Sequence, residues 1–197
     1  MNRVKPVARK RDSAATKAAI LRAARVRFAN FSYEQVRLKD IAADAKCDVA
    51  LIGRYFTSKE NLYTLVLWEL LDPDNLIAGD RATFGARIAR SILSESPANI
   101  DLSPTLVVVH GATSGTTQPL LQKMMQERFL GPIADWLGGK DRLVKAQLVA
   151  ILCGGAVIHQ KAVPQFAQTS KLKKAYERAL ADALQACVGP SEDTGHG

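Results

Sequence analysis

The sequence predicts an all-α protein in which a small, basic N-terminal module of short helices precedes a larger helical domain. Apolar residues recur at intervals of three and four along most of the chain, which is typical of helices with one buried face. The run Leu106 to Val109 has strand propensity but stands alone, and a single strand has nothing to pair with. The length, 197 residues, suits a small module joined to a larger one.

The first helix is expected after a basic arm. Residues 1–12 contain Pro6 and no apolar period, so we expect them to be a flexible arm. Ser13 or Thr16 is then positioned to cap a helix. The residues expected to form its buried stripe are Leu21, Ala24, Phe28 and Phe31.

Two short helices and one longer helix follow. The second helix has the apolar positions Leu38, Ile41, Ala42 and Ala45. The turn Lys46-Cys47-Asp48 leads to a third helix, with Asp48 as its N-cap and with Ile52 and Phe56 on its buried face. A fourth helix begins near Ser58 and ends near Pro73, since proline disfavours helical geometry in the residue before it.

The rest of the chain is also predicted to be helical. Apolar periodicity places helices at roughly residues 80–94, 104–112, 118–137, 141–163 and 170–188. Residues 189–197 are polar and are expected to form a flexible tail.

The net charge of +8 is confined to the first third of the chain. Residues 1–60 contain 14 basic and 6 acidic residues, whereas residues 61–197 contain 13 of each. A positive patch restricted to one module favours phosphate binding. A solvated basic tail is the alternative, because Arg3, Lys5 and residues 9–11 supply much of the excess.

Three short helices, with a tight turn between the second and third, form a helix-turn-helix pattern that fits the DNA major groove. Spacing alone would also suit any small helical bundle. However, the segment from Thr16 to Leu62 resembles the DNA-binding domain of TetR-family regulators. The matching residues are Ile20-Leu21, Ala23-Ala24, Phe28-Ala29, Tyr33, Asp40-Ile41-Ala42, Ala45 and Tyr55-Phe56-Thr57-Ser58-Lys59-Glu60-Asn61-Leu62.

The resemblance implies a helix-turn-helix DNA-binding domain at residues 13–62 and a helical effector-binding and dimerisation domain at residues 63–188. It implies these DNA-binding residues: Arg37, Lys39, Asp48, Val49, Ala50, Leu51, Arg54, Tyr55 and Lys59. Residues 49–51 are apolar and suit thymine methyl groups, so Lys39 and Arg54 are the better candidates for polar base contacts. Tyr55 and Lys59 match positions that usually touch phosphate, and Arg37 replaces a frequent Thr or Ser cap.

Two residues depart from the family pattern. Lys46 replaces a frequent turn glycine and would need a left-handed or adjusted backbone, at about 1 kcal/mol. Gly53 replaces a common tyrosine and lowers helix propensity by about 0.5–1 kcal/mol. Arg54 or the basic arm could supply the lost phosphate contact.

The resemblance also implies a homodimer and a small-molecule effector. The dimer face is expected on the last two helices, at Leu143, Ala146, Leu148, Val149, Leu152, Gly154, Gly155, Ala156, Val157, Ala179, Ala183, Leu184 and Ala186. An intramolecular core is the alternative for these residues. The candidate effector-lining residues are Phe84, Ile88, Val107, His110, Met124, Met125, Phe129 and Trp136, each of which could equally be ordinary core.

Other function classes lack motifs. Gly111-Ala112-Thr113-Ser114-Gly115 is not GxSxG, and GxxxxGK[ST], GxGxxG and HExxH are absent, so we expect neither an enzyme nor a cofactor. Three dispersed cysteines argue against a structural metal or disulfides. No signal peptide or unbroken membrane-length apolar run is visible, so we expect a cytoplasmic protein. The sequence therefore predicts a regulator whose partners are a palindromic DNA operator, a second copy of the chain and a small-molecule effector. A DNA-architectural protein without an effector is the alternative.

Overall fold

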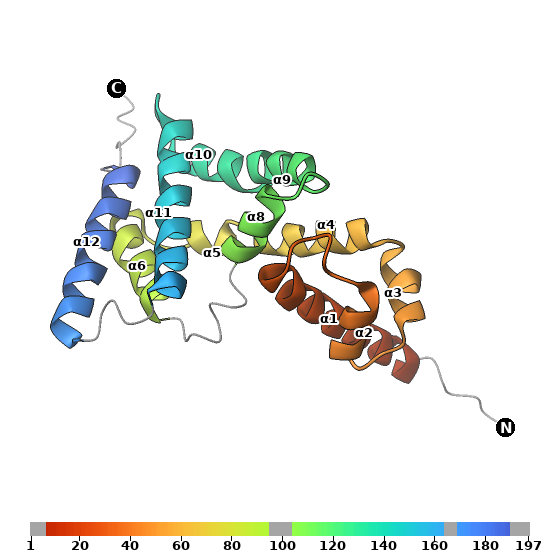
Figure 1. The fold of residues 1–197 in the computed structure, drawn as a ribbon. Coiled ribbons are helices and arrows are strands. Elements are labelled where there is room, and N and C mark those ends of the chain that lie inside the picture. Colours follow the sequence, from red (N-terminus) through yellow and green to blue (C-terminus); the bar gives the residue numbers. More distant parts are fainter. Residues whose placement is uncertain (1–6, 95–103, 164–168, 190–197) are drawn as a thin grey trace. The chain divides into compact units, whose positions relative to one another are not determined.

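The computed structural model describes residues 7–94, 104–163 and 169–189, and each element in these ranges is a helix (Figure 1). The all-α prediction is confirmed. The elements up to residue 94 are α1 (Val7–Asn30), α2 (Leu38–Asp44), α3 (Val49–Phe56), α4 (Lys59–Leu70), α5 (Asp74–Ile77), the 3-10 helix η1 (Arg81–Thr83) and α6 (Phe84–Ser94). Those that follow are α8 (Pro104–Ala112), α9 (Gln118–Met124), the π-helix η2 (Met125–Leu130), α10 (Gly131–Leu137), α11 (Arg142–Ala162) and α12 (Ser170–Val188).

The chain forms two compact units. The first comprises residues 1–70 and 106–122, and the second comprises residues 71–105 and 123–197. A segment from the C-terminal half, which includes most of α8 and α9, therefore belongs with the helix-turn-helix. The core of the first unit is built on Ile20, Phe28, Ile41, Ile52 and Phe56, all of which are buried.

The start of α1 differs from the sequence prediction. The helix begins at Val7 rather than near Ser13 or Thr16, so half of the expected arm is helical. Residues 1–6 of that arm, and residues 190–197 of the expected tail, lie outside the described residues. Phe31 is also wrongly placed in the buried stripe: α1 ends at Asn30, and Phe31 is 43% exposed.

In the second unit, α6, α11 and α12 pack around a core that includes Phe84, Ala89, Val149 and Leu184 (Figure 1). Gly85 allows α6 and α12 to approach closely, because a Cβ atom at this position would overlap the carbonyl oxygen of Ala181. The Gly85 backbone N–H donates to Oε1 of Gln185 at 2.9 Å. Close backbone approach and a side-chain hydrogen bond thus fix the same helix pair.

Arg81 joins the ends of two helices in this unit. Its Nη1 donates to the carbonyl oxygen of Trp136 at 2.6 Å. Its Nη2 donates to the carbonyl oxygens of Leu137 at 2.7 Å and Val188 at 3.1 Å. Carbonyls in the last turn of a helix have no intrahelical donor, so one guanidinium satisfies the ends of both α10 and α12.

The residues expected to form a dimer face on α11 divide between two sides of that helix. Ala146, Val149, Ala156 and Val157 are buried in the second unit's own core, as is Leu184 of α12. For these residues the dimer prediction is wrong, because α6 and α12 already cover them. The opposite side of α11 carries an exposed apolar stripe made of Val144, Leu148, Ile151, Gly155 and Ile158.

Among the described residues, α11 is long and apolar enough to cross a membrane by length and composition, with a mean hydropathy of 1.4 in its best window. No unbroken apolar run of membrane length was expected from the sequence, since Lys145 and Lys161 bound the apolar part of this helix. One such helix is weak evidence for a membrane protein. Its two apolar sides have different roles, since one lies in the core and the other is the exposed stripe.

Candidate nucleic-acid interface

The turn between α2 and α3 is closed by a left-handed residue, as the sequence analysis anticipated. Lys46 has φ 53°. Its N–H donates to the carbonyl oxygen of Ala43 at 3.1 Å, and the N–H of Cys47 donates to that of Ala42 at 3.0 Å. This pair of hydrogen bonds is a Schellman motif, which usually has glycine at the left-handed position. The turn therefore has the left-handed geometry that glycine usually supplies, despite the lysine.

Asp48 sets the start of α3. Its side-chain Oδ1 accepts a hydrogen bond from the backbone N–H of Ala50 at 2.7 Å, which confirms the predicted N-cap. The same residue was assigned to DNA binding. Its described partner is the backbone of α3, whose start it orients, and its DNA-binding role remains a prediction.

The face of α3 opposite the core is open. Ile52 and Phe56 are buried, as predicted, whereas Val49 is 48% exposed and Arg54 is also exposed. Ala50 is exposed, and Leu51 and Tyr55 are half-buried. Outside the backbone of α3 and the two adjacent residues, no heavy atom lies within 4 Å of the position that a Cβ on Gly53 would occupy. The helix thus presents apolar side chains at its start and one cation near its end.

Two further cations lie at the start of α2. Arg37 is the N-cap residue of α2 and makes no side-chain cap hydrogen bond, as expected from the loss of the hydroxyl. Arg37 and Lys39 are both exposed. Together with Arg54 they bring exposed positive charge to both helices of the motif.

Lys59, at the start of α4, is turned toward the loop between α1 and α2. Its Nζ donates to the carbonyl oxygen of Val36 at 2.9 Å and lies 4.1 Å from the ring centroid of Tyr33. Burial lowers the pKa of Lys59, and the negative charge of Glu34 opposes this shift. The sequence analysis assigned this ammonium to phosphate. Phosphate binding by Lys59 remains a prediction. The structure shows a second role, in which Lys59 holds the loop between α1 and α2 against the start of α4.

An aromatic cluster fixes α4 against α1 and the same loop. The rings of Phe28 and Tyr63 meet edge to face at 4.9 Å, and those of Tyr33 and Tyr63 at 5.4 Å. Burial raises the pKa of Tyr63 to about 12, so its hydroxyl stays protonated at neutral pH. Sequence reasoning missed Tyr63, because helical periodicity gives its burial but not its partners.

Glu34 connects this loop to the segment contributed by the C-terminal half. The Ser114 hydroxyl, in the turn between α8 and α9, donates to Oε1 of Glu34 at 2.5 Å. That hydrogen bond holds the pKa of Glu34 below its ordinary value. Ser114 is only 4% exposed. The pair is 80 residues apart in sequence, and no local pattern could have indicated it.

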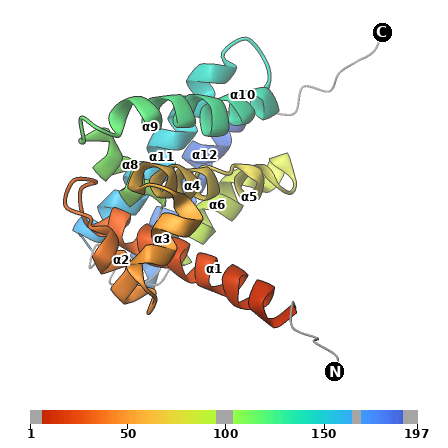
Figure 2. The same ribbon diagram turned by 90° about the vertical axis from the view of Figure 1, so that its right-hand side faces the viewer.

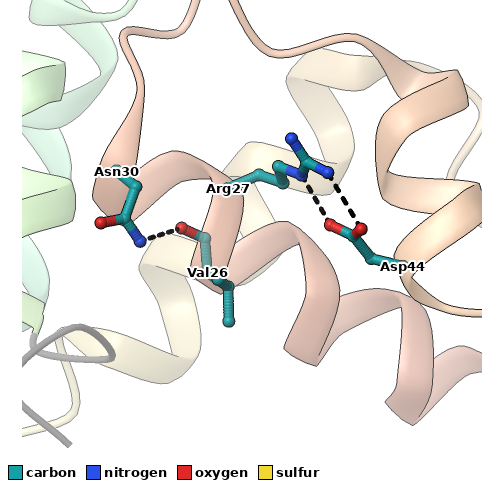
Figure 3. Close-up of polar contacts among 4 residues, drawn as sticks. All are labelled: Val26, Arg27, Asn30 and Asp44. Carbon is teal, nitrogen blue, oxygen red and sulfur yellow. Dashed lines mark hydrogen bonds and ion pairs between the residues drawn. The ribbon is translucent and has the colours of Figure 1, made fainter. Parts of the chain in front are cut away.

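An ion pair links α1 to the end of α2 (Figure 3). Nε of Arg27 donates to Oδ2 of Asp44 at 2.6 Å, and Nη2 donates to Oδ1 at 2.9 Å. The pairing lowers the pKa of Asp44. A bidentate pair of this kind orients α2 on α1, although its partial exposure limits its effect on stability.

The eight predicted effector-lining residues divide between the units. Val107 and His110 belong to the first unit, and the other six belong to the second. Phe84, Ile88, Val107 and Met124 are buried, while His110, Met125, Phe129 and Trp136 are half-buried. Trp136 packs on Phe84 with ring centroids 5.2 Å apart. Their role in ligand binding remains a prediction, and no group of three potential metal ligands occurs among the described residues.

Two family models match the chain. Residues 20–66 match the bacterial regulatory proteins of the tetR family, and residues 82–188 match the tetracyclin repressor-like C-terminal domain. The second match alone covers more than half of the chain. The protein belongs to the TetR family. It is thus a DNA-binding transcription regulator with a helix-turn-helix, as the resemblance of residues 16–62 indicated.

Solved structures of TetR-family regulators share this fold. The protein from Shewanella sp. PV-4 has a TM-score of 0.62 at 16% identity, over 85% of this chain and 97% of that one. The protein from Mesorhizobium loti MAFF303099 has a TM-score of 0.58 at 17% identity, over 89% and 96%. The protein from Rhodococcus sp. RHA1 gives 0.51 at 18%, over 90% and 97%. No curated protein matches the sequence.

Proposed function

We propose that this TetR-family regulator is a cytoplasmic repressor that binds a palindromic operator as a homodimer, without catalytic activity, and leaves it when a small molecule binds. The observation that carries the DNA-binding part is the open face of α3, with Arg54 exposed beside a glycine that leaves the surface clear. This face belongs to the domain that the TetR family shares.

The composition of the motif supports a mixed mode of DNA recognition. Val49 and Ala50 at the exposed start of α3 suit apolar contact with thymine methyl groups. Arg54 and Lys39 are longer and charged, so they can reach a base edge or a phosphate. Tyr55 offers a hydroxyl to phosphate. Specificity would then depend on shape and methyl groups as much as on hydrogen bonds to bases.

The homodimer is supported by the stripe on α11. Val144, Leu148, Ile151, Gly155 and Ile158 are spaced alternately by four and three residues, the spacing by which one helix packs against another. Ile151 is 66% exposed, and a large apolar side chain is costly to leave in water. Two copies of the stripe would cover each other. A dimer also reads two half-sites, which gives a short recognition helix useful affinity.

Coupling between effector binding and DNA binding is supported by the way the chain passes between the two units. The segment of residues 106–122 belongs to the first unit, yet it is joined at both ends to residues of the second. Glu34 and Ser114 connect this segment to the loop that precedes α2. A change in the second unit would therefore reach the DNA-binding motif through α8, α9 and α4. Of the candidate lining residues, Val107 and His110 lie on α8 and Met124 is the last residue of α9.

Operator binding is tested by selecting duplexes from genomic or random-sequence DNA with the purified full-length protein. We expect one palindrome to be enriched. Substituting Arg54→Ala should then weaken binding to it by ~1–3 kcal/mol, measured by fluorescence anisotropy, because a base or phosphate contact is lost. The dimer should stay intact. Unchanged affinity would remove Arg54 from the interface.

A DNA-architectural protein without an effector is the alternative function. Such a protein would bind the selected palindrome and a scrambled duplex of equal length with similar affinity, whereas a regulator should prefer the palindrome by a factor of about 10³ or more. Equal affinities would favour the architectural function.

The effector part has its own test. Candidate small molecules that displace the protein from the operator are titrated calorimetrically into the free and the operator-bound dimer. Because coupling is reciprocal, we expect the operator-bound form to bind the effector at least about fivefold more weakly. Equal affinities for the two forms would contradict effector release.

A further inference from the structure

Most of the net positive charge of residues 1–60 lies ahead of the domain that the family shares. Residues 1–19 hold six basic residues and one acidic residue, a net of +5. Residues 20–60 hold eight basic and five acidic residues, a net of +3. The family match begins only at residue 20. The shared domain therefore does not account for the larger part of this charge.

The same region carries a helical extension. Helix α1 begins at Val7, but none of the described side chains from Ser13 to Ala19 is buried, and the core stripe starts at Ile20. At ~1.5 Å per residue, the stretch from Ser13 to Ala19 runs for about 10 Å without a buried side chain. In Figure 2 the start of α1 extends past α2 and α3. The hydrophobic core does not explain why the helix includes residues 13–19.

One contact ties the extension to the candidate interface. Nζ of Lys17 lies 5.4 Å from the ring centroid of Tyr55, on α3. Lys17 is exposed, and a cation over an exposed ring gains only about 0.5–1 kcal/mol. The Lys17 ammonium therefore lies beside Tyr55, which is expected to touch phosphate. Because the contact with the ring is weak, the ammonium can leave it to bind a neighbouring phosphate.

We propose that the part of α1 that precedes Ile20 is a second DNA-contacting element, which binds backbone phosphates next to the groove that α3 enters, with Lys17 contributing one phosphate contact per subunit. The proposal rests on the DNA-binding function proposed above. It accounts for the excess charge before residue 20, for the absence of buried side chains from Ser13 to Ala19 and for the position of Lys17. A merely solvated extension would give none of the effects below.

The test is the salt dependence of binding to the selected palindrome, measured by anisotropy between 50 and about 300 mM KCl. Each phosphate contact adds about 0.9 to the slope of log affinity against log salt. Lys17→Met should therefore reduce the slope by about 1.8 for a dimer. It should weaken binding to the palindrome and to a scrambled duplex by the same factor, since phosphates carry no sequence information. Lys17→Arg should retain the wild-type slope.

The matched control is Arg22→Met on the same helix. Arg22 is exposed but lines a hollow with Asp44 and Lys46, at the far end of α2. It should leave the slope unchanged. An unchanged slope in Lys17→Met, or an equal decrease in both variants, would overturn the proposal. If the slope is unchanged while Arg54→Ala still weakens binding, only this proposal fails; if the wild type prefers no duplex, the proposed function fails.

A Tyr55→Phe background tests whether Lys17 contacts phosphate itself or acts through the Tyr55 hydroxyl. The ring that Lys17 faces remains, but the tyrosine hydroxyl is gone. If Lys17 binds phosphate itself, Lys17→Met should lower the slope by the same amount in this background. Loss of the effect would show that Lys17 acts only by positioning Tyr55, and would overturn the proposal.

Discussion

Lys46 and Gly53 depart from the family pattern, and the structure accommodates them differently. Lys46 adopts φ 53° and is held there by the two hydrogen bonds that end α2. The local strain of a left-handed lysine, about 1 kcal/mol, is offset by satisfied backbone groups. Gly53 has no such requirement. Its φ is not positive, and nothing lies near the position of its missing side chain.

We therefore expect Gly53→Ala to stabilise the protein by about 0.5–1 kcal/mol, because alanine has the higher helix propensity and meets no neighbour. The free energy of unfolding in urea measures the effect. Gly85→Ala is the contrasting variant: its Cβ would overlap the Ala181 carbonyl oxygen, and it should destabilise the second unit. A loss of stability in Gly53→Ala would show that the glycine is needed for the fold of α3.

Single residues could be predicted where a helical stripe or a cap determines their place. Ile41, Ile52 and Phe56 are buried as periodicity indicated, and Asp48 caps α3. Lys59 could not be placed in the same way. Whether a lysine at a helix start points outward or toward Val36 depends on a loop 23 residues earlier, and the sequence pattern carries no information on that contact.

At the scale of elements, the bounds of most helices could be predicted from residues that start or end a helix. Prolines, glycines and caps placed α3, α8 and α12 at the predicted bounds. The start of α1 was missed because Pro6 and a polar, basic stretch resemble a coil, yet a helix tolerates polar residues all round when it extends from a packed segment. The π-helix Met125–Leu130 was missed because its residues keep an ordinary helical pattern.

Contacts between elements were beyond sequence reasoning. The Arg81 side chain donates hydrogen bonds to carbonyl oxygens at the ends of α10 and α12, which lie 55 to 107 residues away in sequence. Because a donor this distant leaves no local signature, the ends of those helices could be predicted only from Gly138 and Gly189. The same holds for Glu34 and Ser114, which place a segment of the C-terminal half in the DNA-binding unit.

At the scale of the whole molecule, the predicted dimer depends on which side of α11 is available. Small residues and glycines suggested a close-packed face, but the buried ones serve the second unit's own core. Apart from Gly155, the exposed stripe is built from larger side chains, at alternating spacings of four and three. Periodicity could predict that α11 is apolar on more than one side, whereas only the packing of α6 and α12 shows which side remains uncovered.

Ile151→Glu should convert the dimer into a monomer. Ile151 is 66% exposed within one chain and lies in the middle of the stripe, so the fold of each subunit should persist. In the dimer, two unpaired carboxylates would lose water, and we expect the dissociation constant to rise on the order of 100-fold or more. Sedimentation should show the mass falling toward the 21.4 kDa of one chain, and operator affinity should fall with it. Leu65→Glu, at an exposed leucine of α4, is the control and should stay dimeric. A wild-type monomer, or an Ile151→Glu dimer of unchanged affinity, would contradict an interface at this stripe.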